Sequence, residues 1–273
     1  MNGEKQKPWA AVVLLGALVA GCACCELFMT KDPTYMDLTN SMRAPDKEFL
    51  FGTDTMGRDI FSMIWYGGRV SLLIGCASTL LSTAIAVVFG AFSALAPKGL
   101  DGLLMRFTEI VLSIPSLLVI VFVQVVFGEA NVLTISIVIG ITSWCGIAKV
   151  VRTQVRKLRS SEFVLAARCM GGGFFYVLWR HLLPNFTASI SFMVIMNIRN
   201  AIVAESTLSF LGIGLPLEII SWGSMLSLAQ QALLTDAWWV VLFPGGFLAV
   251  TLLCITGIGS CAQDVLMRKE RNL

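Results

Sequence analysis

Long apolar runs alternate with short polar segments along nearly the whole chain. Each run reaches the roughly 20 residues that a helix needs to cross the hydrocarbon of a bilayer. The pattern predicts an all-α membrane protein with six transmembrane helices. The predicted spans are Trp9 to Met29, Val70 to Ala96, Leu103 to Phe127, Val132 to Val151, Ala188 to Leu211 and Ala237 to Ala262.

Composition supports the same class. Of the 273 residues, 56% are hydrophobic and only 14% are charged, and the mean hydropathy is +0.81. Because soluble domains have about 25% charged residues, we expect an integral membrane protein. The net charge is only +3, and the basic residues flank the apolar runs instead of covering a soluble face, so nucleic acid is not the expected partner.

The lysines and arginines are distributed unevenly between the two sides of the predicted bundle. If the N-terminus is cytoplasmic, most of them, Lys5 and Lys7 included, fall on the inner side, and the two shorter outer loops contain none. The positive-inside rule then places both termini and the basic stretch from Arg152 to Asn185 in the cytoplasm. The predicted divisions are an anchor helix with a long extracytoplasmic connector (1–69), a five-helix core (70–263) and a cytoplasmic basic tail (264–273).

The stretch from Arg152 to Asn185 contains a short predicted helix. Ser160 or Ser161 can cap it, and Glu162 in its first turn suits the positive end of the helix dipole. A run of glycines that begins at Gly171 ends it. Its apolar face is predicted at helical spacing from Phe163, Ala166, Ala167 and Met170.

A second amphipathic piece begins at Phe174 and is expected to end before Pro184, which lacks the N–H that a helix interior needs. A basic loop between spans is typical of a segment that lies on lipid headgroups. A small-residue helix face, followed by glycines and a proline that fix its angle, also suits docking into a groove of a partner protein. The residue types leave both interpretations open.

The same stretch resembles the cytoplasmic loop of permease subunits of binding-protein-dependent ABC importers. That family's pattern is E-A-A, three residues, G, nine residues, I, any residue, L-P, and the matching residues here are Ala166, Ala167, Gly171, Leu183 and Pro184. Leu165 stands where glutamate is usual, and His181 stands where isoleucine is usual. The ending R-H-L-L-P-N looks like the peptide and nickel branch of the family.

The predicted outer connector contains the sequence F-G-T-D-T-M-G-R-D-I-F-S from Phe51 to Ser62. Gly52 and Gly57 suit turns, and the charged residues Asp54, Arg58 and Asp59 suit local ion pairs and caps. A folded connector is therefore favoured over a binding site. Together with G-x-R-x-S-L at residues 67–72, the segment resembles the region before the second span of C-type permease subunits of peptide and nickel importers.

Polar residues inside the predicted spans mark either a pathway or contacts between helices, because charge is costly in hydrocarbon. Asn197, Arg199 and Glu205 lie on the fifth predicted span, and Glu205 opens E-S-T-L-S-F-L-G-I-G, which resembles another motif of the same family. Their residue types leave the pathway role and the structural role equally open. On the third span, Pro115 is expected to produce a kink.

The sequence shows no sign of enzymatic or metal chemistry. It contains neither the G-x-x-x-x-G-K-[ST] phosphate loop nor H-E-x-x-H. A metal site from Cys22, Cys24 and Cys25 is not expected, because their spacing matches no zinc pattern. Val19 to Cys22 looks like a lipoprotein processing site, but the apolar run continues past Cys22 to the length of a full span, so a retained anchor helix is preferred.

As a member of this importer family, the chain is expected to be a multi-pass permease subunit of the cytoplasmic membrane, without catalytic residues, that translocates short peptides. Nickel or a metal chelate is the alternative cargo. The resemblance implies a B-type permease, an extracytoplasmic binding protein and two ATPase subunits as partners, with ATP and Mg used by the ATPases and no cofactor bound by this chain. It assigns ATPase coupling to Glu162, Phe163, Ala166, Ala167, Gly171, His181, Leu183 and Pro184.

Two other classes stay open at this point. A secondary transporter or channel would be expected to show inverted repeats and interrupted helices around coupling ions, and no convincing internal repeat is present in the chain. A membrane-embedded scaffold without transport is disfavoured by Arg199 and Glu205, which have no evident purpose in a scaffold.

Overall fold

The computed structural model describes residues 8–232 and 236–271, and within these ranges the chain forms helices and no β-strand. Lys5 and Lys7 lie outside the described residues, as does the side chain of Phe163. The elements are α1 (Pro8–Ala23), α2 (Cys25–Phe28), η1 (Leu38–Asn40), α3 (Ile60–Leu95), α4 (Lys98–Ser113), α5 (Ser116–Phe127), α6 (Val132–Thr142), α7 (Cys145–Leu158), α8 (Glu162–Cys169), α9 (Phe174–Val177), η2 (Leu178–Leu182), α10 (Leu183–Phe210), α11 (Trp222–Ala232) and α12 (Trp239–Arg271).

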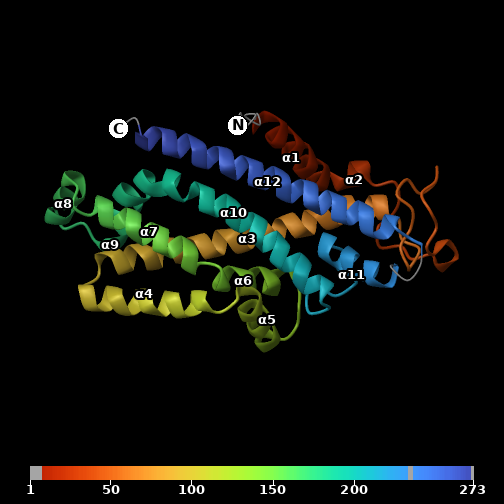
Figure 1. Ribbon diagram of the computed structural model, residues 1–273, viewed down its shortest axis with the longest axis horizontal. Coiled ribbons are helices and arrows are strands. Elements are labelled where there is room, and N and C mark those ends of the chain that lie inside the picture. Colours follow the sequence, from red (N-terminus) through yellow and green to blue (C-terminus); the bar gives the residue numbers. More distant parts are fainter. Residues whose placement is uncertain (1–7, 233–235, 272–273) are drawn as a thin grey trace, which may run out of the picture.

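The helices form an elongated bundle with α8 at one end and the connector between α2 and α3 at the other (Figure 1). The long helix α3 runs through its centre and packs against α6, α7 and α10. Helix α12 covers α10, and α1 packs against both α12 and α3. The end of α12 lies toward the α8 end of the molecule.

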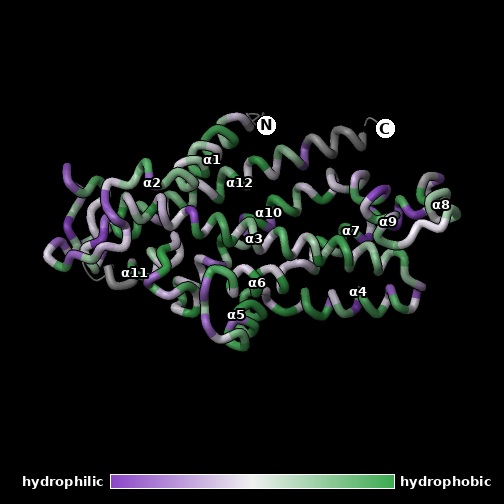
Figure 2. Tube along the Cα trace, turned by 180° about the vertical axis from the view of Figure 1, so that it is seen from behind, coloured by the Kyte–Doolittle hydropathy of each residue, from purple (hydrophilic) through white to green (hydrophobic). Residues whose placement is uncertain are grey.

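Hydropathy follows this arrangement. Figure 2 shows hydrophobic residues along the long helices and hydrophilic residues gathered in the connector and near α8 and α9. Helices approach closely where glycine stands on α3, since a Cβ added at Gly90 would lie 2.5 Å from the carbonyl oxygen of Ala148 on α7. Such small-residue contacts are how helices pack tightly in lipid.

By length and composition, two helices of the described chain can cross a membrane, α3 and the part of α12 up to Asp264. The number rises to four if the bent pairs α4 with α5 and α6 with α7 each count as one span. The other two predicted spans correspond to α10 and to α1, a shorter apolar helix. The structure thus gives an all-helical membrane protein with up to four spans on this criterion, and the count of six stays a prediction.

One predicted boundary was wrong, and one predicted span is part of a longer helix. Helix α3 begins at Ile60, ahead of the predicted span from Val70, so G-x-R-x-S-L lies inside the helix. The chain does not leave the helical path before Pro184, because this residue occupies the first turn of α10, where its missing N–H leaves no helical hydrogen bond unmade. The preceding turn is π-helical, and its Leu183 N–H donates to the carbonyl of Leu178.

The third predicted span is broken and not simply kinked. Helices α4 and α5 meet at 93°. Ile114 is extended, as a residue before proline prefers to be, and Pro115 starts the next helix. The fourth span is also interrupted, with 47° between α6 and α7, and this second break was not predicted.

Candidate functional site: a docking end and a central cavity

Helix α8 is a short helix with a defined stop. Glu162 is its first residue, and Gly171 follows it with a φ of +83°, a left-handed conformation that glycine adopts without strain. The Gly172 N–H donates to the carbonyl of Ala167 at 2.9 Å, which completes a Schellman-type end. The expected helix with its glycine stop is therefore confirmed.

Helix α8 is fixed to the bundle by buried apolar side chains. Val164 is fully buried and Ala167 is 4% exposed. They share one hydrophobic cluster with Leu178 and Leu182 of the π-helical turn and with the ends of α3 and α7 nearest α8, including Ala91, Ala94, Val151 and Val155. Closely packed interiors have low compressibility and transmit strain, and this cluster connects α8, through α9 and the π-helical turn, to the ends of α3 and α7.

The two adjacent alanines point in different directions. Ala167 lies in the cluster, whereas Ala166 is exposed. Of the predicted face of Phe163, Ala166, Ala167 and Met170, Ala167 is therefore turned into the core, whereas Ala166 and the 81% exposed Met170 lie outside it. Large apolar side chains on α8, α9 and the π-helical turn are also exposed, and they are Leu165, Phe175, Tyr176 and Trp179. We call Ala166, Met170 and these four residues the docking face.

The remaining residues of the loop motif lie on the π-helical turn and at the start of α10. His181 lies on the π-helical turn, and its ring meets that of Tyr176 edge to face at 5.6 Å between centroids. Leu183 packs against the hydrophobic cluster, and Pro184 is exposed at the start of α10. The motif thus divides into residues that shape the segment and residues, such as Ala166, that face outward.

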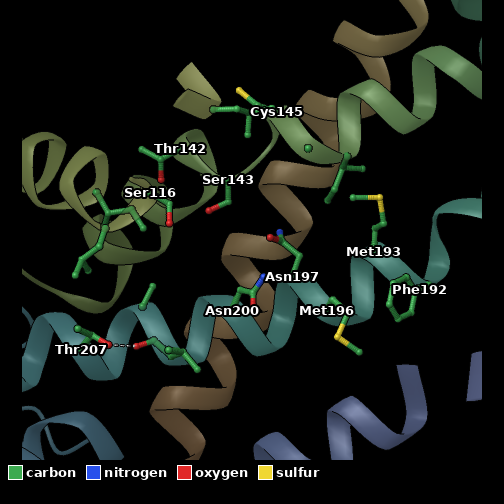
Figure 3. Close-up of a pocket in the computed structure, with 17 residues that line it drawn as sticks. Ser116, Thr142, Ser143, Cys145, Phe192, Met193, Met196, Asn197, Asn200 and Thr207 are labelled. Atoms are coloured by element: carbon green, nitrogen blue, oxygen red, sulfur yellow. Dashed lines mark hydrogen bonds between the residues drawn. The ribbon is translucent and has the colours of Figure 1, made fainter. Parts of the chain in front are cut away.

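A cavity of about 610 Å³ lies where both helix breaks meet the middle of α10 (Figure 3). Polar side chains come from all three places, and Asn197 and Asn200 lie on the side of α10 that faces Ser116 and Ser143. The lining includes no Asp, Glu, Lys, Arg or His. Its polar members are Ser116, Thr142, Ser143, Asn197, Asn200 and Thr207.

The breaks explain why this region is polar. A helix end leaves peptide N–H and C=O groups without helical partners, and within a membrane such irregular backbone is tolerated only where it is buried in protein or borders a cavity. The break before α5 and the break before α7 both open onto the same cavity. The arrangement is able to hold a neutral, hydrogen-bonding ligand at mid-bundle.

Of the three polar residues predicted on this span, only Asn197 lines the cavity. Its Nδ2 also donates to Ser82 Oγ of α3 at 2.6 Å. Arg199 does not line the cavity and, within the described chain, makes no ion pair with Glu205. Asn200 and Thr207 were missed, although their spacing from Asn197 along one helix face was a usable signal.

Glu205 is instead buried in a cage of hydroxyl groups. It receives hydrogen bonds from Ser221 at 2.7 Å, from Ser209 at 3.1 Å and from Ser71 at 3.1 Å. These serines come from α10, from α3 and from the residue before α11, so Glu205 joins the three elements. Gly223 is close by, and a Cβ there would lie 2.9 Å from Glu205 Oε1. Of its two interpretations, the structure favours the role between helices.

The connector motif at residues 51–62 stabilises the local fold. Asp54 and Arg58 form a buried ion pair with 2.8 Å between Oδ2 and Nε. Asp59 caps α3 by accepting from the Ser62 N–H at 3.1 Å. Gly52 and Gly57 both have a φ of +75°. The ion pair, the cap and the turns expected from the sequence are all confirmed.

The connector also contains carboxylates whose hydrogen bonds favour the charged form. The hydroxyl and the amide of Thr39 lower the pKa of Asp37 below its usual value. The amides of Phe49 and Glu48, with Arg43, do the same for Asp46. Asp46 is exposed and Asp37 is half-buried, and both organise short turns.

Comparison with known proteins agrees with this geometry. Residues 86–272 match the family described as "Binding-protein-dependent transport system inner membrane component". The chain is 36% identical over 245 residues to the oligopeptide transport system permease protein OppC of Bacillus subtilis (strain 168), covering 90% of this chain and 80% of that protein. It is 35% identical over 234 residues to the dipeptide transport system permease protein DppC of the same organism, covering 86% and 73%. With OppC of Salmonella typhimurium (strain LT2) the identity is 35% over 254 residues, covering 90% and 83%.

Proposed function

Because the chain belongs to the family of inner membrane components of binding-protein-dependent transport systems, we propose that it is the C-type permease subunit of an ATP-driven importer of short peptides. The permease proteins that it resembles are named for oligopeptide and dipeptide transport. The observation that carries the coupling part of the proposal is the docking face, an exposed apolar surface on a segment whose other side is locked into the bundle.

The proposal assigns one partner to each end of the molecule. Two ATPase subunits contact the docking faces of this chain and of a B-type permease, and an extracytoplasmic binding protein delivers the substrate at the connector end. Both termini are then cytoplasmic, and six spans cross the membrane. The exposed apolar side chains of α4 and α5, such as Phe107, Ile110 and Phe122, suit contact with lipid or with the second permease.

Transport follows from the rigid attachment of α8. ATP binding brings the two ATPases together and displaces α8, and the shared hydrophobic cluster carries the inner ends of α3 and α7 with it. The start of α7 borders the cavity, so this displacement changes the cavity's shape. Hydrolysis of ATP by the partner subunits then restores the starting arrangement.

The cavity favours peptides over metal as cargo. Its amide and hydroxyl side chains can hydrogen-bond peptide groups, and its lack of charge avoids selecting substrates by side-chain charge. Nickel needs imidazole, thiolate or carboxylate ligands, and the lining offers one such residue, Cys145. A metal chelate, whose ligands are already supplied, stays the second candidate.

The test is substitution of Ala166 by glutamate in the complete complex. The change places a charge in the docking face without entering the core, so we expect loss of the ATPase subunits during purification in mild detergent and loss of peptide uptake. Ala44→Glu, at an exposed site in the connector, is the matched control and should retain both. Retention and uptake that are equal in the two variants would contradict the coupling role.

A further inference from the structure

One acidic side chain at the α8 end of the bundle joins three helices. Asp101, in the first turn of α4, receives two hydrogen bonds from Arg152 of α7, at 2.5 Å to Oδ1 and 2.6 Å to Oδ2. Arg156 of α7 donates to Oδ2, and Ser93 Oγ of α3 donates to Oδ1 at 2.7 Å. Each carboxylate oxygen therefore accepts twice, in the bidentate geometry that gives arginine its strongest contacts.

Helix α4 has few other attachments to the bundle. Of its 16 residues, only Asp101, Met105 and Thr108 are buried. A Cβ added at Gly99 or Gly102 would meet nothing within 4 Å, so no neighbouring element presses on these positions. The Asp101 side chain, only 4% exposed, is the charged member of the narrow buried stripe. The end of α4 near Asp101 is thus held by α3 and α7, and its charged contacts are with the two arginines of α7.

Helix α7 leads directly to the docking segment. Residues 159–161 join it to α8, and Arg159 Nη1 adds a hydrogen bond to the carbonyl of Ala94 on α3 at 3.2 Å. The opposite ends of both clamped helices border the cavity, α4 through Leu112 and α7 through Gly146 and Ile147. One ion-pair cluster therefore links two cavity walls to the segment that the ATPases would contact.

We propose that Asp101 is a positioning residue that makes α4 move together with α7 when α8 is displaced. This inference rests on the proposed function of the chain as an importer permease. With the clamp intact, displacement of α8 moves both broken spans and reshapes the cavity from two sides. Without it, α7 follows α8 while α4 stays behind, and ATP is hydrolysed with less substrate carried.

The experiment compares variants of the complete importer in liposomes, with peptide uptake per ATP hydrolysed as the measured quantity. For Asp101→Asn we expect this ratio to fall about fivefold or more, the size of an ordinary coupling between sites, with retention of the ATPases unchanged. Glu109→Gln is the matched control, because Glu109 pairs with Lys149 between the same two helices at 3.3 Å but is 61% exposed. Its ratio should not change.

A second variant keeps the test decisive. Arg152→Lys preserves the charge but cannot hold both carboxylate oxygens, so it should assemble and still lower the ratio. A ratio equal to that of the unaltered complex in Asp101→Asn, or in Arg152→Lys where the first variant does not assemble, overturns the coupling role. If the unaltered complex takes up no peptide, the proposed function fails first and the coupling role fails with it.

Discussion

The two ends of the molecule both contain recognisable motifs but use them in opposite ways. At the connector end, Asp54 and Arg58 are each about 2% exposed and form an ion pair with one another. At the α8 end, the motif holds a short helix in place through Val164 and Ala167 while the neighbouring Leu165 and Met170 remain in solvent. The motif at the connector end stabilises the fold, whereas the motif at the α8 end exposes an apolar surface.

This difference shows that a family motif identifies a segment of the chain, but it does not identify which of its residues contact a partner and which pack inside the fold. A buried ion pair tolerates little change, because loss of one partner leaves the other charge without compensation. Substitutions in an exposed apolar face should change the folding free energy little, and they should instead weaken the binding of a partner. Stability and coupling measurements should therefore separate the two ends.

The largest effect on stability is expected at the buried pair. Asp54→Ala leaves Arg58 buried with its charge unpaired, and we expect a loss of about 3–5 kcal/mol in folding free energy. Thermal unfolding of the purified chain in detergent would measure it. Arg43→Ala removes exposed connector ion pairs with Asp46 and Glu48, and should cost under about 1 kcal/mol. Equal losses would mean that burial does not distinguish these pairs.

Gly57 provides a second probe of the connector. An alanine Cβ there would lie 1.7 Å from the carbonyl oxygen of Asp37, so the turn must move as well as adopt a strained φ. We expect Gly57→Ala to cost about 3 kcal/mol. Gly128→Ala is the control, because Gly128 also has a positive φ, +81°, but nothing lies within 4 Å of the added atom. It should cost only the backbone strain, about 1–2 kcal/mol. The same unfolding assay compares the two.

The α8 end should separate stability from coupling. Val164→Ala removes methyl groups from the buried cluster and should lower folding free energy by about 2 kcal/mol. Leu165→Ala, at the next residue but 49% exposed, should leave unfolding unchanged and weaken retention of the ATPases. A stability loss at Leu165 as large as that at Val164 would show that the docking face is part of the core.

The sequence predicted the elements of this fold better than their interruptions. Apolar runs located α3, the α4–α5 pair, the α6–α7 pair, α10 and α12, since each is long enough to stand out from its flanks. The break at Pro115 left a signal in the residue itself. The break before Cys145 left none, because Ser143 and Trp144 are ordinary residues in a membrane helix and only packing interrupts them.

Only part of the candidate site was predicted from the sequence, and the reason is similar. Asn197 was found because polar side chains in apolar runs are conspicuous, but the same rule selected Glu205, which lies in a serine cage away from the cavity. Which polar side chain faces a cavity depends on how the neighbouring helices pack. The residues that flank a polar position in the sequence do not reveal that packing. Asp101 was missed because its partners, Arg152 and Arg156, are distant in sequence and looked like lipid-facing charges.

The smallest effect is expected from pH, and it should be confined to the connector. The pKa of Asp37 is lowered, first by the Thr39 hydroxyl, so ionisation favours the fold. That contribution is complete above the unfolded value of about 3.9 and is lost as pH falls through the lower folded pKa. The hydrogen-exchange protection factors of residues 30–59, which compare each measured rate with the intrinsic rate at the same pH, should therefore fall below about pH 4, while those of α8 do not. Asp37→Asn should lower the connector's protection factors already at pH 6. Protection factors in the connector that are constant down to pH 3 would mean that these turns do not depend on the charged carboxylates.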